Sequence, residues 1–65
     1  MPVIIFEGGP MEPGKKKDLI CELTDAAAKV TGLNPHAFII CIHENPTDNV
    51  GLGGECLTDV LAKGN

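Results

Sequence analysis

The chain has 65 residues, a formal net charge of −4 and five basic residues, all of them lysine. One small domain is expected over residues 1–65, and an acidic chain with no arginine and two aromatic residues lacks the groups that bind nucleic acid. No signal peptide and no membrane span are expected, because neither sequence pattern is present. The three cysteines match neither a disulfide framework nor a zinc motif, which predicts free thiols and a cytoplasmic location.

The first predicted strand covers residues 2–6 (PVIIF), an apolar run without polar alternation. The following GGPMEPG is a loop by its glycine and proline content, and Pro13 suits the first turn of a helix because a proline there loses no hydrogen bond. Helical periodicity continues to Gly32, which is placed for a left-handed C-terminal cap. The apolar side of this helix is expected to consist of Leu19, Ile20, Leu23, Ala26, Ala27 and Val30.

The second predicted strand covers residues 37–42 (AFIICI) and is ended by His43 and Glu44. A loop then leads to GLGGE, which lacks both the GxGxxG pattern and the P-loop lysine of a phosphate-binding loop. Its glycines instead favour a tight turn with positive φ angles. The last segment fits either a short helix or a hairpin followed by a packing arm.

The order of strand, long helix and strand predicts a β-α-β unit with parallel strands, because a helix of this length is the usual crossover between parallel neighbours. The fold class is therefore α/β (α+β), with a glycine-rich hairpin or tail. One helix cannot cover both faces of two apolar strands, and a two-stranded sheet is marginal in water. We therefore expect other copies of the chain to complete the fold.

Pro2 allows two interpretations. It can simply open the strand, where a proline is tolerated because no ladder donor is needed. Alternatively, removal of Met1, which is favoured by a small second residue, would leave Pro2 with a free secondary amine at the end of an apolar strand. Position alone favours the first interpretation.

The other candidate residues carry weaker signals. His36 and His43 lack further metal ligands at a suitable spacing, so no metal site is expected. Cys41 lies inside an apolar strand and is expected to pack as a small hydrophobic residue. The lysines at 15–17 are expected to lie in the first turns of the helix, with their side chains in solvent.

Four segments together resemble the 4-oxalocrotonate tautomerase family: MPVI at the start, GKKKDLICELTDAAAKV, AFIICIHE and NVGLGGE. The resemblance covers nearly the whole chain. It implies a small β-α-β enzyme without a cofactor, assembled as a homo-oligomer, a hexamer or a related trimeric arrangement, with sites shared between subunits. It also favours the catalytic interpretation of Pro2.

In that family the initiator methionine is removed, and the proline nitrogen acts as general base and acid in enol–keto proton transfer next to a keto acid. A model α-amino group has a pKa of about 8, and burial in an apolar pocket would lower the pKa of a Pro2 amine toward neutrality. Such a base suits proton transfer at neutral pH. The resemblance therefore predicts a tautomerase, an isomerase that acts on a small 2-keto or enol acid.

The sequence departs from the family at the groups that bind substrate. The arginines that members acting on dicarboxylates use are missing from the loop at residues 9–12 and from the second strand, where Ile39 stands. The aromatic residue usually found just before GxGG is Val50. A dicarboxylate substrate is therefore not expected.

Other residues could take over these contacts. Lys15 or Lys16 could supply a weaker cation, although a lysine does not reproduce a bidentate guanidinium. His43 is a candidate hydrogen-bond donor, and Glu12 near the mouth would repel an anion. Lys15, His43 and Val50 are thus the predicted substrate-binding residues beside catalytic Pro2.

Two functional hypotheses follow. The first is a tautomerase that uses the processed Pro2 as its base. The alternative is a catalytically impaired oligomeric module with the tautomerase fold that binds a small ligand or a protein partner, which the missing arginines favour.

Overall fold

The computed structural model describes residues 1–64. Its helices and strands are, in chain order, β1 (Val3–Gly8), α1 (Pro13–Thr31), β2 (Ile39–Glu44), β3 (Gly51–Leu52), β4 (Glu55–Cys56) and α2 (Leu57–Ala62), with the 3-10 turns η1 (Pro35–Ala37) and η2 (Thr47–Asn49).

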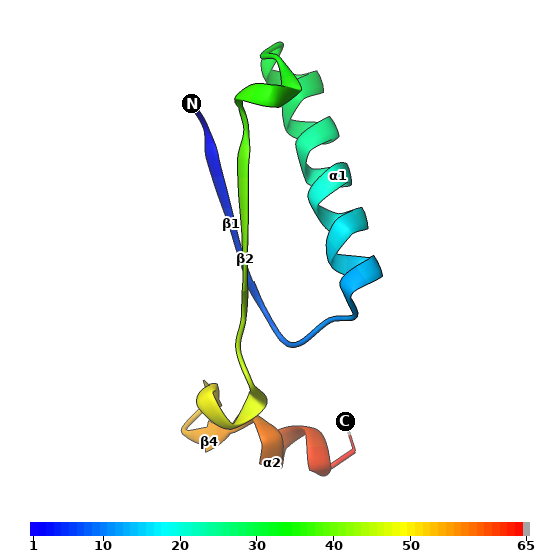
Figure 1. Cartoon of the computed structure of the whole chain (residues 1–65). Coiled ribbons are helices and arrows are strands. Elements are labelled where there is room, and N and C mark those ends of the chain that lie inside the picture. Colours follow the sequence, from blue (N-terminus) through cyan, green and yellow to red (C-terminus); the bar gives the residue numbers. More distant parts are fainter. Residues whose placement is uncertain (65) are drawn as a thin grey trace.

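The centre of the fold is a parallel pair of strands. β1 and β2 are aligned from Val3 opposite Ile39 to Gly8 opposite Glu44, and α1 runs along one face of the pair (Figure 1). β3 and β4 form an antiparallel hairpin. The predicted β-α-β unit with parallel strands is therefore confirmed. The tail combines parts of the two alternatives, because the predicted hairpin is followed directly by the short helix α2 and not by a packing arm.

The ends of α1 are as the sequence predicts. Pro13 is at its first position, and Gly32 has a φ of 75° while its N–H donates to the Ala28 carbonyl at 2.9 Å. The predicted apolar side is wrong at its C-terminal end, where Val30 is 85% exposed. A helix of 19 residues is about 28 Å long and strands of 6 residues are about 20 Å long, so the last turn of α1 extends past the sheet.

β2 begins two residues later than predicted, because residues 35–37 form a 3-10 turn. The Asn34 side chain caps this turn by accepting a hydrogen bond from the His36 N–H at 2.8 Å. Both strands also run two residues further than predicted, so that Glu7 and His43 are paired within the sheet. The glycine turn is as expected, with φ angles of 62° at Gly53 and 86° at Gly54.

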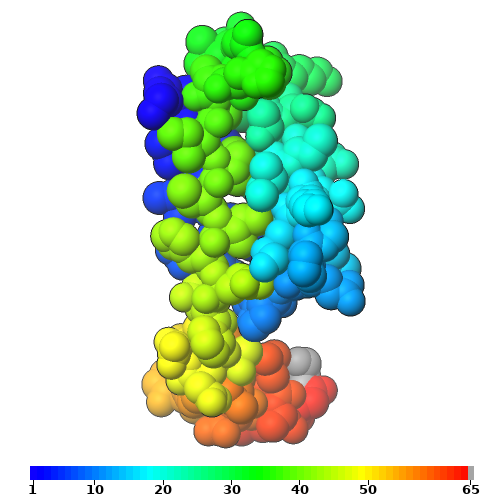
Figure 2. All heavy atoms as spheres, in the orientation of Figure 1, coloured from blue at the N-terminus to red at the C-terminus, as the bar shows by residue number. Residues whose placement is uncertain are grey.

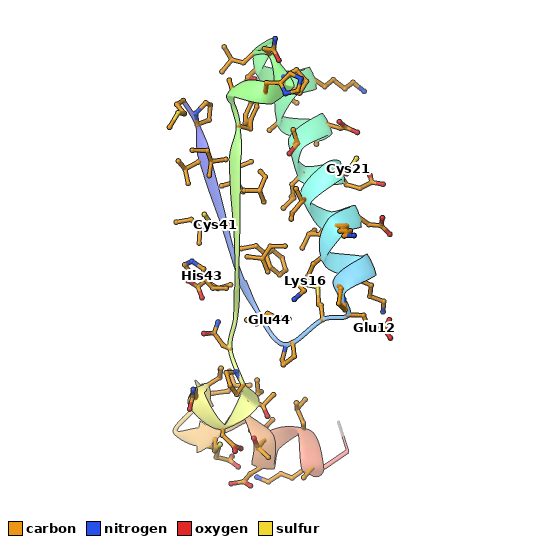
Figure 3. The ribbon with its side chains drawn as sticks, viewed as in Figure 1. Glu12, Lys16, Cys21, Cys41, His43 and Glu44 are labelled. Carbon is orange, nitrogen blue, oxygen red and sulfur yellow. The ribbon has the colours of Figure 1, made fainter. Side chains whose placement is uncertain are left out.

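One face of the sheet is uncovered. Side chains of paired residues in parallel strands point to the same face, so Ile4 and Phe6 face α1 while Ile5 and Cys41 face away from it. Figure 3 shows Cys41 and His43 on the side opposite the helix. Ile5 is 58% exposed. An apolar stripe therefore runs along this face and ends at the pair of Glu7 and His43.

The chain alone is not compact. None of the side chains described is fully buried, and the segment after β2 forms a lobe beyond the end of the sheet (Figure 2). The radius of gyration is 15.2 Å, whereas a compact chain of this length is expected to have about 11 Å. The exposed surface is 4877 Å², against about 4,000 Å² for a compact protein of this mass. The excess resembles the surface that one partner loses in a standard interface, about 800 Å².

Candidate active site

Pro2 lies at the amino end of β1, directly before the first strand residue. Its carbonyl accepts a hydrogen bond from the Ile39 N–H at 3.0 Å, which anchors the residue to the start of β2. Pro2 is half-buried, whereas Met1 is 89% exposed. The position of Pro2 is thus set by the sheet, and the residue in front of it makes little contact with the chain.

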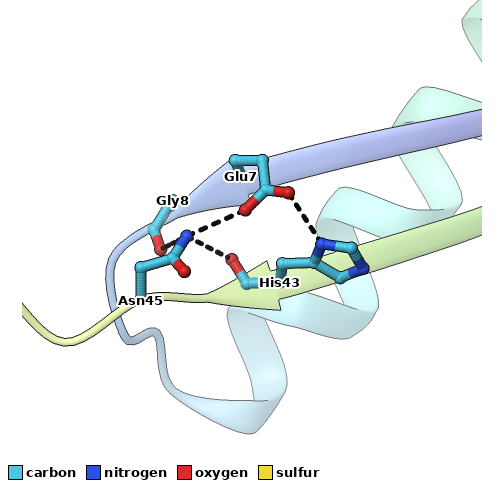
Figure 4. A network of polar contacts seen from close by, with 4 residues as sticks. All are labelled: Glu7, Gly8, His43 and Asn45. Carbon is cyan, nitrogen blue, oxygen red and sulfur yellow. Dashed lines mark hydrogen bonds and ion pairs between the residues drawn. The ribbon is translucent and has the colours of Figure 1, made fainter. Parts of the chain in front are cut away.

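A network of polar side chains lies at the opposite end of the sheet (Figure 4). The Glu7 carboxylate contacts His43 Nδ1 at 2.7 Å and accepts a hydrogen bond from Asn45 Nδ2 at 2.9 Å. Asn45 also donates its backbone N–H to the Gly8 carbonyl at 2.7 Å. These bonds join β1 to the segment that leaves β2.

The network fixes the charge of Glu7. Hydrogen bonds from Asn45 and then from His43 lower the pKa of the Glu7 carboxyl below its usual range, because they stabilise the charged form. Glu7 is therefore ionised at neutral pH. The candidate donor His43 has its Nδ1 engaged by this carboxylate, and its Nε2 is left for other contacts.

A pocket of about 230 Å³ opens beside this network. Its walls are mainly small and apolar, with a carboxylate and an amide among them, and they consist of Glu7, Gly8, Gly9, Asn45, Thr47, Val50 and Leu57. Val50, which the sequence placed among the substrate-binding residues, lines this pocket. The Val50 carbonyl accepts a hydrogen bond from the Leu57 N–H at 2.7 Å, which fixes the turn between η2 and α2.

The lysines of the first turn of α1 differ in their surroundings. Lys15 is exposed, whereas Lys16 Nζ pairs with Glu44 Oε1 at 3.2 Å. Glu44 also accepts the Met11 N–H at 2.9 Å, and this bond is the main cause of a lowered pKa of the Glu44 carboxyl, followed by the bond from Lys16. Figure 3 shows Lys16 and Glu44 between β2 and α1. The predicted cationic role is thus left to Lys15, because Lys16 holds the loop before α1.

The described part of the chain contains no metal cluster. Residues 1–64 contain no group of three or more histidine, cysteine or acidic side chains that could hold a metal ion. Cys21 is exposed on α1, and the charge of Asp25 raises the pKa of its thiol, which keeps it protonated.

None of the described helices has the length and apolarity to cross a membrane.

One chain does not bring the predicted site residues together. His43, Val50 and Lys15 come from elements near the carboxyl ends of the strands, whereas Pro2 is at the amino end. Pro2 and Glu7 are five positions apart along the extended strand, a span of about 17 Å. The pocket is therefore not next to Pro2 of the same chain.

Glu7 and Asn45 were missed as site residues at the sequence level. The first predicted strand ends one residue before Glu7, and Asn45 lies in the loop predicted after the second strand. Extending both strands by two residues in parallel register would have paired Glu7 with His43, and this was the signal available.

Comparison with known proteins identifies relatives that match most of the chain. Residues 2–60 match the family model Tautomerase, described as tautomerase enzyme. The chain is 40% identical over 45 residues to probable tautomerase K2 of Dickeya dadantii, a match that covers 69% of this chain and 67% of that protein.

Solved structures are similar over nearly the full length. DmpI from Archaeoglobus fulgidus superimposes with a TM-score of 0.84 at 41% identity, covering 89% of this chain and all of DmpI. An unfused 4-OT in its apo form superimposes with a TM-score of 0.86 at 27% identity, covering 91% of this chain and 98% of that one. The arrangement of β1, α1, β2 and the C-terminal hairpin is thus shared with both.

Proposed function

Because the chain belongs to the tautomerase family of enzymes, we propose that it catalyses enol–keto proton transfer on a small 2-keto or enol acid, with Pro2 as general base and acid. The observation that carries this proposal is the position of Pro2, half-buried and anchored at the amino end of the sheet in a chain that matches the family from residue 2. No cofactor is needed, because the proton leaves and returns through one amine.

The proposed reaction requires Met1 to be removed. The free Pro2 nitrogen then accepts the proton of the enol hydroxyl, and the resulting ammonium gives a proton to the substrate carbon as the carbonyl forms. Each turnover leaves the amine as it began, and the product differs from the substrate only in the place of one hydrogen and one double bond. General base catalysis of this kind typically contributes about 10²–10⁴-fold.

A second copy of the chain is proposed to complete the site. Both edges of the β1–β2 pair are free within the described chain, and identical strands that pair across a two-fold axis run antiparallel. Pairing along β1 would bring Pro2 of one copy to the carboxyl end of β1 in the other, where the pocket with Val50 lies. The uncovered sheet face and the excess surface support such an assembly, and a hexamer of this chain follows the family.

The proposal is tested by following enol–keto conversion of phenylenolpyruvate and 2-hydroxymuconate in the presence of the assembled protein. We expect conversion of at least one of them faster than in buffer, with the monoanionic substrate preferred because the chain has no arginine. Rates equal to the buffer rate for both substrates would contradict the proposed activity.

The alternative, a binding module without turnover, is favoured by two observations: the chain has no arginine, and its pocket carries the carboxylate of Glu7. Binding and turnover measured on the same protein preparation distinguish this binding module from the tautomerase. A ligand that binds with equal affinity to the wild type and to Pro2→Ala, without turnover, would support the binding module.

A further inference from the structure

The pocket at the carboxyl ends of the strands has one charged wall residue among the residues described, Glu7. The rest of the wall offers the amide of Asn45, the hydroxyl of Thr47 and the apolar side chains of Val50 and Leu57. This combination suits an uncharged group, because the apolar side chains favour its burial and the amide and hydroxyl can hydrogen-bond it.

The Glu7 charge is held in place. Asn45 Nδ2 binds one carboxylate oxygen at 2.9 Å, and His43 Nδ1 contacts the other at 2.7 Å (Figure 4). The lowered pKa of Glu7 means that the carboxylate stays ionised throughout the neutral range. A ligand in the pocket therefore meets a fixed negative charge.

No lysine lines the pocket among the described residues, and Lys16 is paired with Glu44. His43 can offset the charge of Glu7 only when its ring is protonated. With a neutral His43 ring, the pair of Glu7 and His43 carries a full negative charge. The Glu7 carboxylate would repel a second carboxylate on a ligand in this pocket, because no lysine in the described wall offsets its charge.

We propose that Glu7 is a specificity-determining residue that excludes a second carboxylate, so that the substrate is a 2-keto or enol acid with one carboxylate and an uncharged tail. This inference rests on the proposed function, because it takes the pocket as the place of the tail while Pro2 of another copy acts on the enol. Val50 and Leu57 receive the tail, and Asn45 or Thr47 binds a hydroxyl on it where one is present.

The test compares binding of two six-carbon probes, 2-oxohexanoate and 2-oxoadipate, which differ by one terminal carboxylate. Dissociation constants are measured by NMR titration of the assembled wild type and Glu7→Gln at about pH 8.5, above the histidine pKa of about 6.5 in model peptides. Glutamine keeps the size of Glu7, and its amide oxygen can still accept the hydrogen bond from Asn45 Nδ2, whereas its amide nitrogen can only donate. Repulsion between two negative charges about 6 Å apart, as for Glu7 and a second ligand carboxylate, lowers the affinity by between about threefold and hundredfold. The value depends on the local dielectric constant.

We expect the wild type to bind 2-oxohexanoate about tenfold or more tightly than 2-oxoadipate, and Glu7→Gln to narrow this ratio about threefold or more. Glu22→Gln, on the exposed side of α1, makes the same change in net charge far from the pocket and should leave the ratio unchanged. Light scattering establishes that each variant is assembled.

Three results would overturn the inference: a wild type that binds 2-oxoadipate as tightly as 2-oxohexanoate, a wild type that binds neither probe, or a ratio that is the same in Glu7→Gln. The wild-type ratio decides the matter even where the variant does not fold. Because binding and turnover are measured separately, selective binding without turnover would count against the tautomerase proposal and not against the role of Glu7.

Discussion

Replacing Pro2 with alanine is expected to lower kcat/KM for enol–keto conversion by about 10²–10⁴-fold, the contribution typical of a positioned general base. Methionine is also removed before alanine, so Pro2→Ala keeps a free amine at the same place in the chain. The substitution replaces a rigid secondary amine with a more mobile primary one. The loss should fall mainly on kcat, because the amine moves the proton, whereas the tail of the substrate is bound elsewhere.

A matched control is Pro13→Ala, which exchanges the same residues at the first position of α1. The backbone N–H at the first position of a helix has no partner within the helix, so neither proline nor alanine makes a hydrogen bond there. Alanine is also a good helix former, so the helix should be kept. This variant should retain the wild-type rate. Equal values of kcat/KM for Pro2→Ala and the wild type would show that Pro2 only opens the strand.

Replacing Ile5 with lysine is expected to break the assembly and, with it, all turnover. Ile5 is in the middle of the sheet face that α1 leaves uncovered. Burial of a lysine against an apolar partner without a counter-charge is strongly unfavourable. Light scattering should give a multiple of 6.8 kDa for the wild type and the mass of a single chain for Ile5→Lys.

Val30→Lys provides the control for this prediction, because it makes the same change of charge at an apolar residue in the last turn of α1. Val30 is beyond the end of the sheet and 85% exposed, so the assembly should survive. A wild type that remains a 6.8 kDa monomer at micromolar concentration, yet turns over enol acids, would refute the shared site.

Much of the fold could be predicted because local signals agree with one another. Pro13 and Gly32 mark the ends of α1 through their own backbone preferences, and Gly53 with Gly54 marks the turn of the hairpin in the same way. The start of β2 could not be predicted as well. The cap provided by Asn34 draws residues 35–37 into a 3-10 turn, although their neighbours are apolar and favour a strand.

The site was less predictable than the fold. Pro2 gained its catalytic interpretation from the resemblance of the whole chain to a family, since its position alone favoured a simple strand opener. The network of Glu7, His43 and Asn45 depends on the register between two strands that are 36 residues apart at Glu7 and His43. Residue type alone does not fix that register, because both strands are continuously apolar and tolerate a shift of two residues.

Whether the Pro2 amine is the base is tested most directly by the intact mass of protein that has been shown to convert an enol acid. We expect a mass lower than that of the 65-residue chain by one methionine residue, because only then does Pro2 carry a basic nitrogen. An active protein that retains Met1 would contradict this mechanism, since the Pro2 nitrogen would be an amide whose lone pair is delocalised into the Met1 carbonyl and cannot accept the proton.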